Sequence, residues 1–206
     1  MAQVRTILLP HFEDYPVQVA MFKDVTNASF LRSQLLQANP DFDYAFLDAA
    51  MILSPLPLFL AITLSLHSTL SPATSPLRTR TPHSELVFRL HPNNNIGESY
   101  RKFGISDDTT NLIAVKFSLT PDVTNESVAK HLSEAVQGVS VDVGEDGSEL
   151  GLFADLSKIK KIYKVNDGGV KGKGGKKGVT DQVGTVKDER SALENIIMGV
   201  MTLKGS

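Results

Sequence analysis

The sequence predicts an α+β fold in which a mainly antiparallel sheet is flanked by helices, within one compact domain over residues 1–206. Three observations lead to this prediction. The chain has 206 residues, of which 41% are apolar and 21% charged, so one domain can bury a substantial core. Strand-like and helix-like segments are mixed rather than strictly alternating. The chain has no cysteine, so its core must be stable without disulfides.

A strand and a helix are expected near the N-terminus. Residues 17–22 alternate well enough to form a half-buried strand. Asn27 is a favourable N-cap, and Leu31 and Leu35 follow it at helical spacing. This pattern predicts an amphipathic helix over 28–38.

A long uncharged stretch follows a short strand that we expect over 45–47. From Ala49 to Leu77 the chain contains no Asp, Glu, Lys or Arg. A helix that crosses a bilayer needs about 20 unbroken apolar residues. Pro55 and Pro57 interrupt this stretch on one side, and Pro72 ends it on the other. We therefore expect a buried core helix in a soluble protein of the cell interior, since no secretory signal is recognisable either.

The middle of the chain is expected to alternate between turns, strands and helices. Residues 71–82 hold three prolines among serines and threonines, which predicts a loop. Helices are expected over 96–103, where Gly104 would end the helix in the left-handed conformation, and after the N-cap Thr124. Apolar alternation predicts further strands over 86–90, 111–119 and 139–143.

The last third of the chain carries a concentrated positive charge. The whole sequence has a formal net charge of −2, yet eight lysines and one aspartate lie between Lys158 and Gly178. Residues 150–165 predict a helix or turn, and 166–184 predict a flexible Gly/Lys loop, because that segment has too few apolar residues to order itself. A final helix is expected after Thr185. Its apolar residues recur at helical spacing: Leu193, Ile196, Ile197, Val200 and Met201.

Signatures of enzymes and of metal sites are not found in the sequence. The absence of cysteine excludes thiolate zinc sites, iron–sulfur clusters and a cysteine nucleophile. The five histidines show no spacing typical of a metal site. The glycine-lysine tract 168–178 lacks the glycine spacing and the Lys-Ser/Thr pair of a phosphate-binding loop. We therefore expect neither an enzyme nor a bound cofactor or metal.

Two groups of residues remain as candidate binding sites. The loop Leu77–Arg80 carries two arginines near His83 and Arg89, and arginine forks suit phosphate groups. The apolar stripe of the C-terminal helix is the second candidate, and its residues could belong to the core or to a partner interface.

Several ordered segments of the chain resemble a known family. In order and spacing they are similar to the PRPK-binding protein family, the small non-catalytic subunit of the KEOPS (EKC) complex, and the resemblance runs from about Leu8 to Leu203. The segments that carry it are Phe22–Ala28, Leu31-Arg32, Arg78-Thr79-Arg80 with Ser84-Glu85-Leu86, His91–Ile96, Lys102–Ser106 and Ile159–Lys164.

The resemblance implies a partner and a process. It implies a compact α+β domain that binds the small-lobe side of an atypical protein kinase, with indirect contact to the other subunits. It also implies a role in forming threonylcarbamoyladenosine at position 37 of tRNA, in which this subunit helps to recruit tRNA, including its 3′ tail, and does not catalyse the transfer. A role in telomere maintenance and a location in nucleus and cytoplasm follow from the same resemblance.

The resemblance also implies site residues. Lys23, Arg32, Arg78 and Arg80 fall inside or near its segments, and we expect them to form one patch for the tRNA backbone and tail. We further expect Ile197 and Val200 to be partly exposed on the kinase-binding surface. That surface is expected to comprise Ile159, Ile162, Tyr163, Leu193, Ile196, Ile197 and Val200.

Two other functions remain open from the residues alone. A stand-alone RNA-binding protein would bind tRNA tightly without the kinase. A small nucleotide-binding enzyme would use the glycine-lysine tract, and deletion of 168–178 would abolish its activity.

Overall fold

The centre of the fold is an antiparallel sheet of five strands. In the computed structural model the described residues are 1–165 and 182–204, with the backbone alone for 182–188. The strand order is β1-β2-β4-β3, and β5 pairs with β2 beyond β1. The α+β prediction with a mainly antiparallel sheet is thereby confirmed. The strands are β1 (Val4–Ile7), β2 (Val17–Lys23), β3 (Ala45–Asp48), β4 (Leu112–Phe117) and β5 (Val139–Val141).

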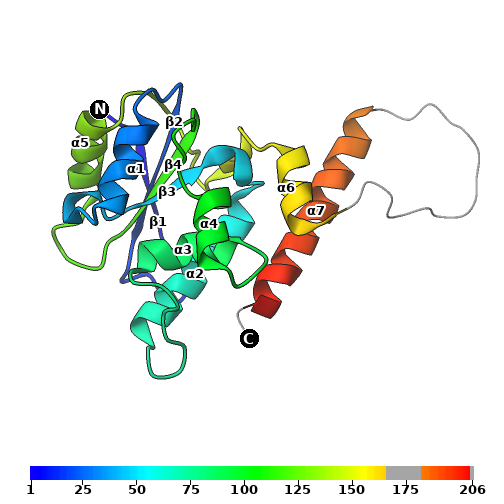
Figure 1. Cartoon of the computed structure of the whole chain (residues 1–206), viewed down its shortest axis with the longest axis horizontal. Helices are drawn as coiled ribbons and strands as arrows, with labels where there is room; N and C mark the ends of the chain where they lie inside the picture. Colours follow the sequence, from blue (N-terminus) through cyan, green and yellow to red (C-terminus); the bar gives the residue numbers. More distant parts are fainter. Residues whose placement is uncertain (166–181, 205–206) are drawn as a thin grey trace, which may run out of the picture.

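Helices cover both faces of this sheet (Figure 1). One face packs against α1 (Ala28–Leu36) and α5 (Asn125–Ala135), and the other against a larger group of helices. Side chains of β2 alternate between the faces, with Met21 in the larger core and Phe22 in the smaller one. The larger group is α2 (Pro55–Leu70), α3 (Pro82–Leu90), α4 (Ile96–Phe103), α6 (Leu156–Tyr163) and α7 (Gln182–Lys204). Short 3-10 turns complete the fold: η1 (Pro40–Phe42), η2 (Ala49–Met51) and η3 (Ser148–Gly151).

The uncharged stretch forms α2, as expected. Pro55 stands at the start of this helix, where a missing N–H costs no hydrogen bond. Leu58, Ile62 and Leu66 are fully buried in the larger core. None of the helices that the structure describes is long and apolar enough to span a bilayer.

The strand expected over 86–90 is wrong, because these residues form the second half of α3. Thr81 caps this helix through a hydrogen bond from the Ser84 N–H, and the Ser84 hydroxyl accepts one from the Thr81 N–H. The helix is buried on nearly all sides from Glu85 to Leu90. Because Leu86, Phe88 and Leu90 are all buried on this helix, their spacing also fits a period of two.

Other boundaries differ in smaller ways. The strand β1 was not anticipated. Gly104 does not adopt the left-handed conformation, since its φ is −74°. Glycine is required there for space, because a Cβ would lie 2.7 Å from the Tyr100 carbonyl oxygen. Helix α7 begins at Gln182, before the expected start after Thr185. The Gly/Lys loop expected over 166–184 lies outside the described residues up to 181.

Candidate functional site

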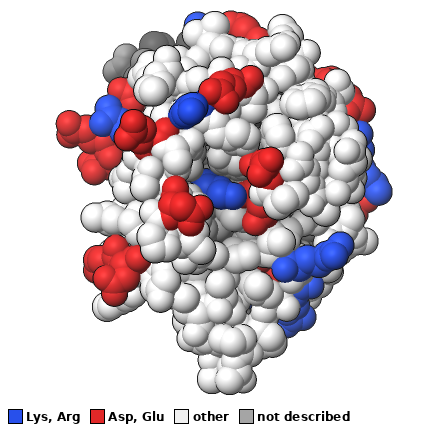
Figure 2. All heavy atoms as spheres, turned by 90° about the vertical axis from the view of Figure 1, so that its left-hand side faces the viewer, with Lys and Arg blue, Asp and Glu red and all other residues white. Residues whose placement is uncertain are grey.

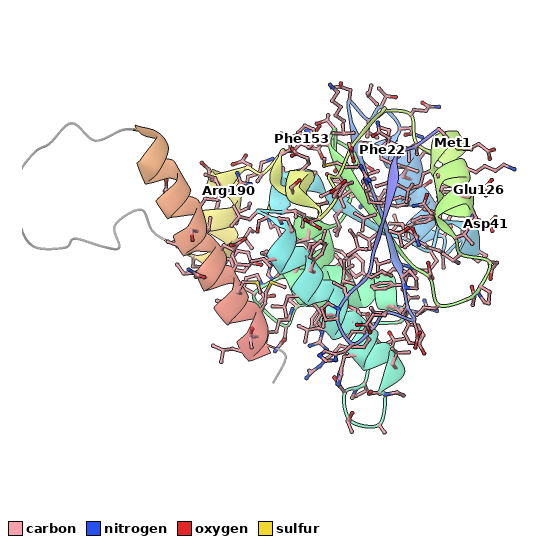
Figure 3. The ribbon with its side chains drawn as sticks, turned by 180° about the vertical axis from the view of Figure 1, so that it is seen from behind. Met1, Phe22, Asp41, Glu126, Phe153 and Arg190 are labelled. Atoms are coloured by element: carbon pink, nitrogen blue, oxygen red, sulfur yellow. The ribbon has the colours of Figure 1, made fainter. Side chains whose placement is uncertain are left out.

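Helix α7 lies along one side of the molecule, against α2 and α6 (Figure 1). Its inner side is part of the larger core, with Leu193, Ile197 and Met201 each no more than 2% exposed. Polar contacts hold this helix to the domain near Arg190 and at Lys204. The Arg190 guanidinium donates to the Gly151 carbonyl oxygen at 2.8 Å, and Arg190 is on the side of α7 turned toward the body of the molecule (Figure 3). At the other end, the Lys204 ammonium donates to the His91 carbonyl oxygen at 2.8 Å.

The outer side of α7 is exposed and uncharged. Ile196 is 41% exposed and Leu203 is 76% exposed, while Val200 is half-buried at the margin. None of the exposed residues from Ser191 to Leu203 carries a charge, and the exposed Glu189 before them pairs with Lys160 on α6. Two of them are small, Ala192 and Gly199, and a Cβ added at Gly199 would meet open space. The cores of protein interfaces are depleted of charge, so this side has the composition of an interface rather than of an ordinary helix surface.

The residues expected to bind a kinase therefore divide into two groups. Ile162, Ile196 and Val200 reach the surface. The expectation of a partly exposed Ile197 is wrong, because its side chain is 2% exposed and belongs to the core. Tyr163 is buried too and its hydroxyl donates to the Leu90 carbonyl oxygen, so it holds α6 against α3. Ile159 and Leu193 are likewise core residues.

The four basic residues expected in one patch lie at opposite ends of the sheet. Lys23 ends β2 just beyond the pair Phe22–Leu112, where β4 begins. Arg32 is nearby and pairs with Asp107 at 3.1 Å, also before β4. The expected single patch is thus contradicted by the register of the sheet.

The loop with Arg78 and Arg80 is at the other end of β4. His83, in the first turn of the helix that follows this loop, accepts a hydrogen bond at Nε2 from the N–H of Phe117, the last residue of β4. Along six residues of strand the two ends are about 17 Å apart. Arg78 and Arg80 can contact one ligand together, whereas Lys23 and Arg32 belong to another surface.

A buried carboxylate holds the Arg78–Arg80 loop. The Glu85 side chain on α3 is fully buried. Its Oε2 accepts hydrogen bonds from the Arg78 N–H at 2.9 Å, the Thr79 N–H at 3.0 Å and the Thr79 hydroxyl at 3.0 Å. Its Oε1 accepts from Arg89 Nε at 2.8 Å. The sequence does not indicate this contact.

A hollow on the side of the molecule away from α7 has a negative field, in contrast to the basic loop with Arg78 and Arg80. It has a volume of about 410 Å³, and its lining includes Asp41, Tyr44, Asp122 and Lys116. Figure 2 shows one basic side chain in this hollow with acidic side chains around it, and Figure 3 places Asp41 on the far side from α7. The Lys116 ammonium donates to the Asp43 carbonyl oxygen at 2.6 Å.

Lys116 is already engaged and its neighbours are acidic. Burial lowers the pKa of its ammonium, although the carboxylates of Asp43, Asp122 and Asp41 oppose this shift. Three carboxylates beside one ammonium make the field of the hollow negative, so it does not suit a nucleic-acid phosphate. Among the described residues no cluster of histidine and carboxylate side chains could hold a metal ion.

Comparison with known proteins identifies the family. Residues 22–205 match the family described as kinase binding protein CGI-121. The chain belongs to this family. The resemblance to a kinase-binding subunit family is thereby confirmed.

Relatives in this family match nearly the whole chain. A protein of Phaeosphaeria nodorum named EKC/KEOPS complex subunit CGI121 is 49% identical over 236 residues, which cover 99% of this chain and 100% of the relative. The Aspergillus fumigatus protein of that name is 41% identical, with 98% and 97% covered. The Schizosaccharomyces pombe protein is 31% identical, with 78% and 88% covered.

Proposed function

We propose that this protein is the non-catalytic kinase-binding subunit of an EKC/KEOPS complex, and that it binds the kinase through the outer side of α7. The family and the names of its relatives support the assignment. The choice of this surface rests on the uncharged, exposed side of α7 around Ile196, Val200 and Leu203. Ile162 on α6 is half-buried and lies within the same helix group.

The kinase surface is tested with charges on the outer side of α7. The double variant Ile196→Glu, Leu203→Glu should lower the affinity for the purified kinase at least about a hundredfold, since unpaired charges in an apolar interface cost several kcal/mol. Affinity is measured by calorimetry with the recombinant kinase, and circular dichroism reports the fold. Lys130→Glu on α5 changes the net charge by the same amount and should leave kinase binding intact.

If the double variant folds like the wild type and binds the kinase with unchanged affinity, the assignment of this surface is contradicted. Full tRNA binding by the chain without any kinase binding would instead favour a stand-alone RNA-binding protein.

We further propose that Arg78 and Arg80 contact tRNA during threonylcarbamoyladenosine formation, where this subunit helps to recruit the tRNA and its 3′ tail. Both arginines are exposed on one loop that Glu85 holds, and neither of them lines the acidic hollow. A location in nucleus and cytoplasm and a part in telomere maintenance belong to the same proposal.

The RNA contact is tested with two matched pairs of arginine and lysine variants. Arg78→Ala, Arg80→Ala should weaken binding of a tRNA transcript and reduce the salt slope by roughly one and a half units, because two phosphate contacts are lost and each contributes somewhat less than one. Lys23→Ala, Arg32→Ala removes the same charge at the other end of the sheet and should have a smaller effect. Equal losses from both pairs would contradict the assignment to the loop, and unchanged binding in both would contradict the RNA contact.

A further inference from the structure

Glu85 is a fully buried titratable group for which the kinase surface provides no role. Its carboxylate is fully buried, and four hydrogen bonds converge on it, three from the loop and one from Arg89. The Arg89 side chain is itself only 7% exposed and also donates to the Ser68 hydroxyl at 3.2 Å. The pair is therefore satisfied and internally neutral.

Stability alone is a weak explanation for such a pair. A buried ion pair is often no more stabilising than apolar residues of similar volume, because both charges must leave water. Here the carboxylate is directed at the backbone of an exposed loop, which water could otherwise solvate. What the carboxylate adds is a fixed loop conformation.

The conformation determines where the two arginines lie. Thr79 is turned inward, where its hydroxyl donates to Glu85 and accepts from the Ser84 hydroxyl at 3.1 Å. Arg78 and Arg80, on either side of it, are exposed. The loop joins α2 to α3 at one end of the molecule (Figure 1). Because Thr79 is held inward, the guanidinium groups of its two neighbours are directed outward.

We propose that Glu85 is a positioning residue for RNA binding, and that its carboxylate fixes the loop from which Arg78 and Arg80 reach the phosphates. This inference rests on the proposed RNA contact of those arginines. The N–H groups of Arg78 and Thr79 are already occupied by Glu85, so phosphates are bound by side chains alone. A fixed loop needs less ordering on binding, which raises affinity without a new contact. Arg89 neutralises Glu85, so the carboxylate does not repel RNA.

Glu85→Gln separates positioning from simple electrostatics. Removal of a carboxylate beside a phosphate site should tighten RNA binding if charge alone matters. Positioning predicts the reverse: about tenfold weaker binding of an unmodified tRNA transcript, with a salt slope close to that of the wild type because both arginines remain. Amide hydrogen exchange at Arg78 and Thr79 should accelerate at least about tenfold, because the glutamine amide has one uncharged acceptor oxygen where the carboxylate has two charged ones for the loop and Arg89.

Two further variants keep the test decisive. Val128→Ala on α5 destabilises the opposite face of the sheet and should leave tRNA binding unchanged, which controls for lost stability. Thr79→Val removes one donor to Glu85 but keeps the ion pair, and it should weaken binding by a few-fold even if Glu85→Gln fails to fold.

The outcomes distinguish this inference from the proposal on which it rests. If Arg78→Ala, Arg80→Ala binds the transcript like the wild type, the RNA contact is overturned and the role of Glu85 with it. If that variant binds weakly while Glu85→Gln and Thr79→Val bind normally, or Glu85→Gln binds more tightly, the positioning role alone is overturned.

Discussion

The two sides of α7 have similar apolar residues and different surroundings. Ile197 faces the core with 2% of its surface exposed, whereas its neighbour Ile196 is 41% exposed. The inner side is covered by α2 and α6, and the exposed residues of the outer side from Ser191 to Leu203 carry no charge. The difference shows that apolar residues on one helix can serve two separate purposes, attachment to the domain and contact with a partner.

The test with the largest expected effect introduces a charge on each side of α7 in turn. Ile197→Glu should lower the free energy of unfolding by at least about 3 kcal/mol, because it loses a buried isoleucine and buries an unpaired carboxylate. Ile196→Glu should change it by no more than about 0.5 kcal/mol, as is usual at exposed positions. Urea denaturation of both variants measures the two values. Equal losses would mean that the two sides of α7 do not differ.

The smallest expected effect concerns Lys204, where α7 ends against α3. Its ammonium donates to the carbonyl oxygens of Phe88 and His91 and lies 3.6 Å from the Phe88 ring centre. Burial, helped by the charges of Arg89 and Arg78, lowers the pKa of Lys204 from 10.5 to about 7.

A pH series of unfolding measurements tests the cost of burying this ammonium at the end of the helix. Above pH 7 the folded chain releases a proton at Lys204 that the unfolded chain keeps up to about pH 10.5, so stability should rise with pH in that window. The group is partly exposed, and the rise between pH 7 and 9 should not exceed about 1 kcal/mol. Lys204→Met should remove this part of the rise, and an identical pH dependence in variant and wild type would contradict it.

Periodicity predicted the elements better than it predicted their surroundings. The spacing of Leu193, Ile197 and Met201 marks one helical stripe, and it correctly indicates the helix. Ile196 and Val200 fit the same stripe, because a wide apolar face leaves the boundary between core and surface undefined. Only the placement of α2 and α6 decides which isoleucine is buried.

The candidate RNA site shows the same limit more strongly. Arg78 and Arg80 could be selected from the sequence because arginine suits phosphate. The role of Glu85 could not, since its partners depend on how the loop folds back on α3. The separation of Lys23 and Arg32 from the loop depends on the register of β2 with β4, which is a long-range property. The misread strand over 86–90 concealed the helix that carries Glu85.

The order of the strands has a consequence for synthesis of the chain. Strand β2 pairs early with β1, but its neighbours β4 and β5 come much later in the sequence. Pairing between distant segments slows folding. While the ribosome is still making the helices in between, β2 has an unpaired apolar edge of the kind that invites aggregation. We therefore expect the nascent chain to aggregate more readily before residues 112–117 have emerged than after.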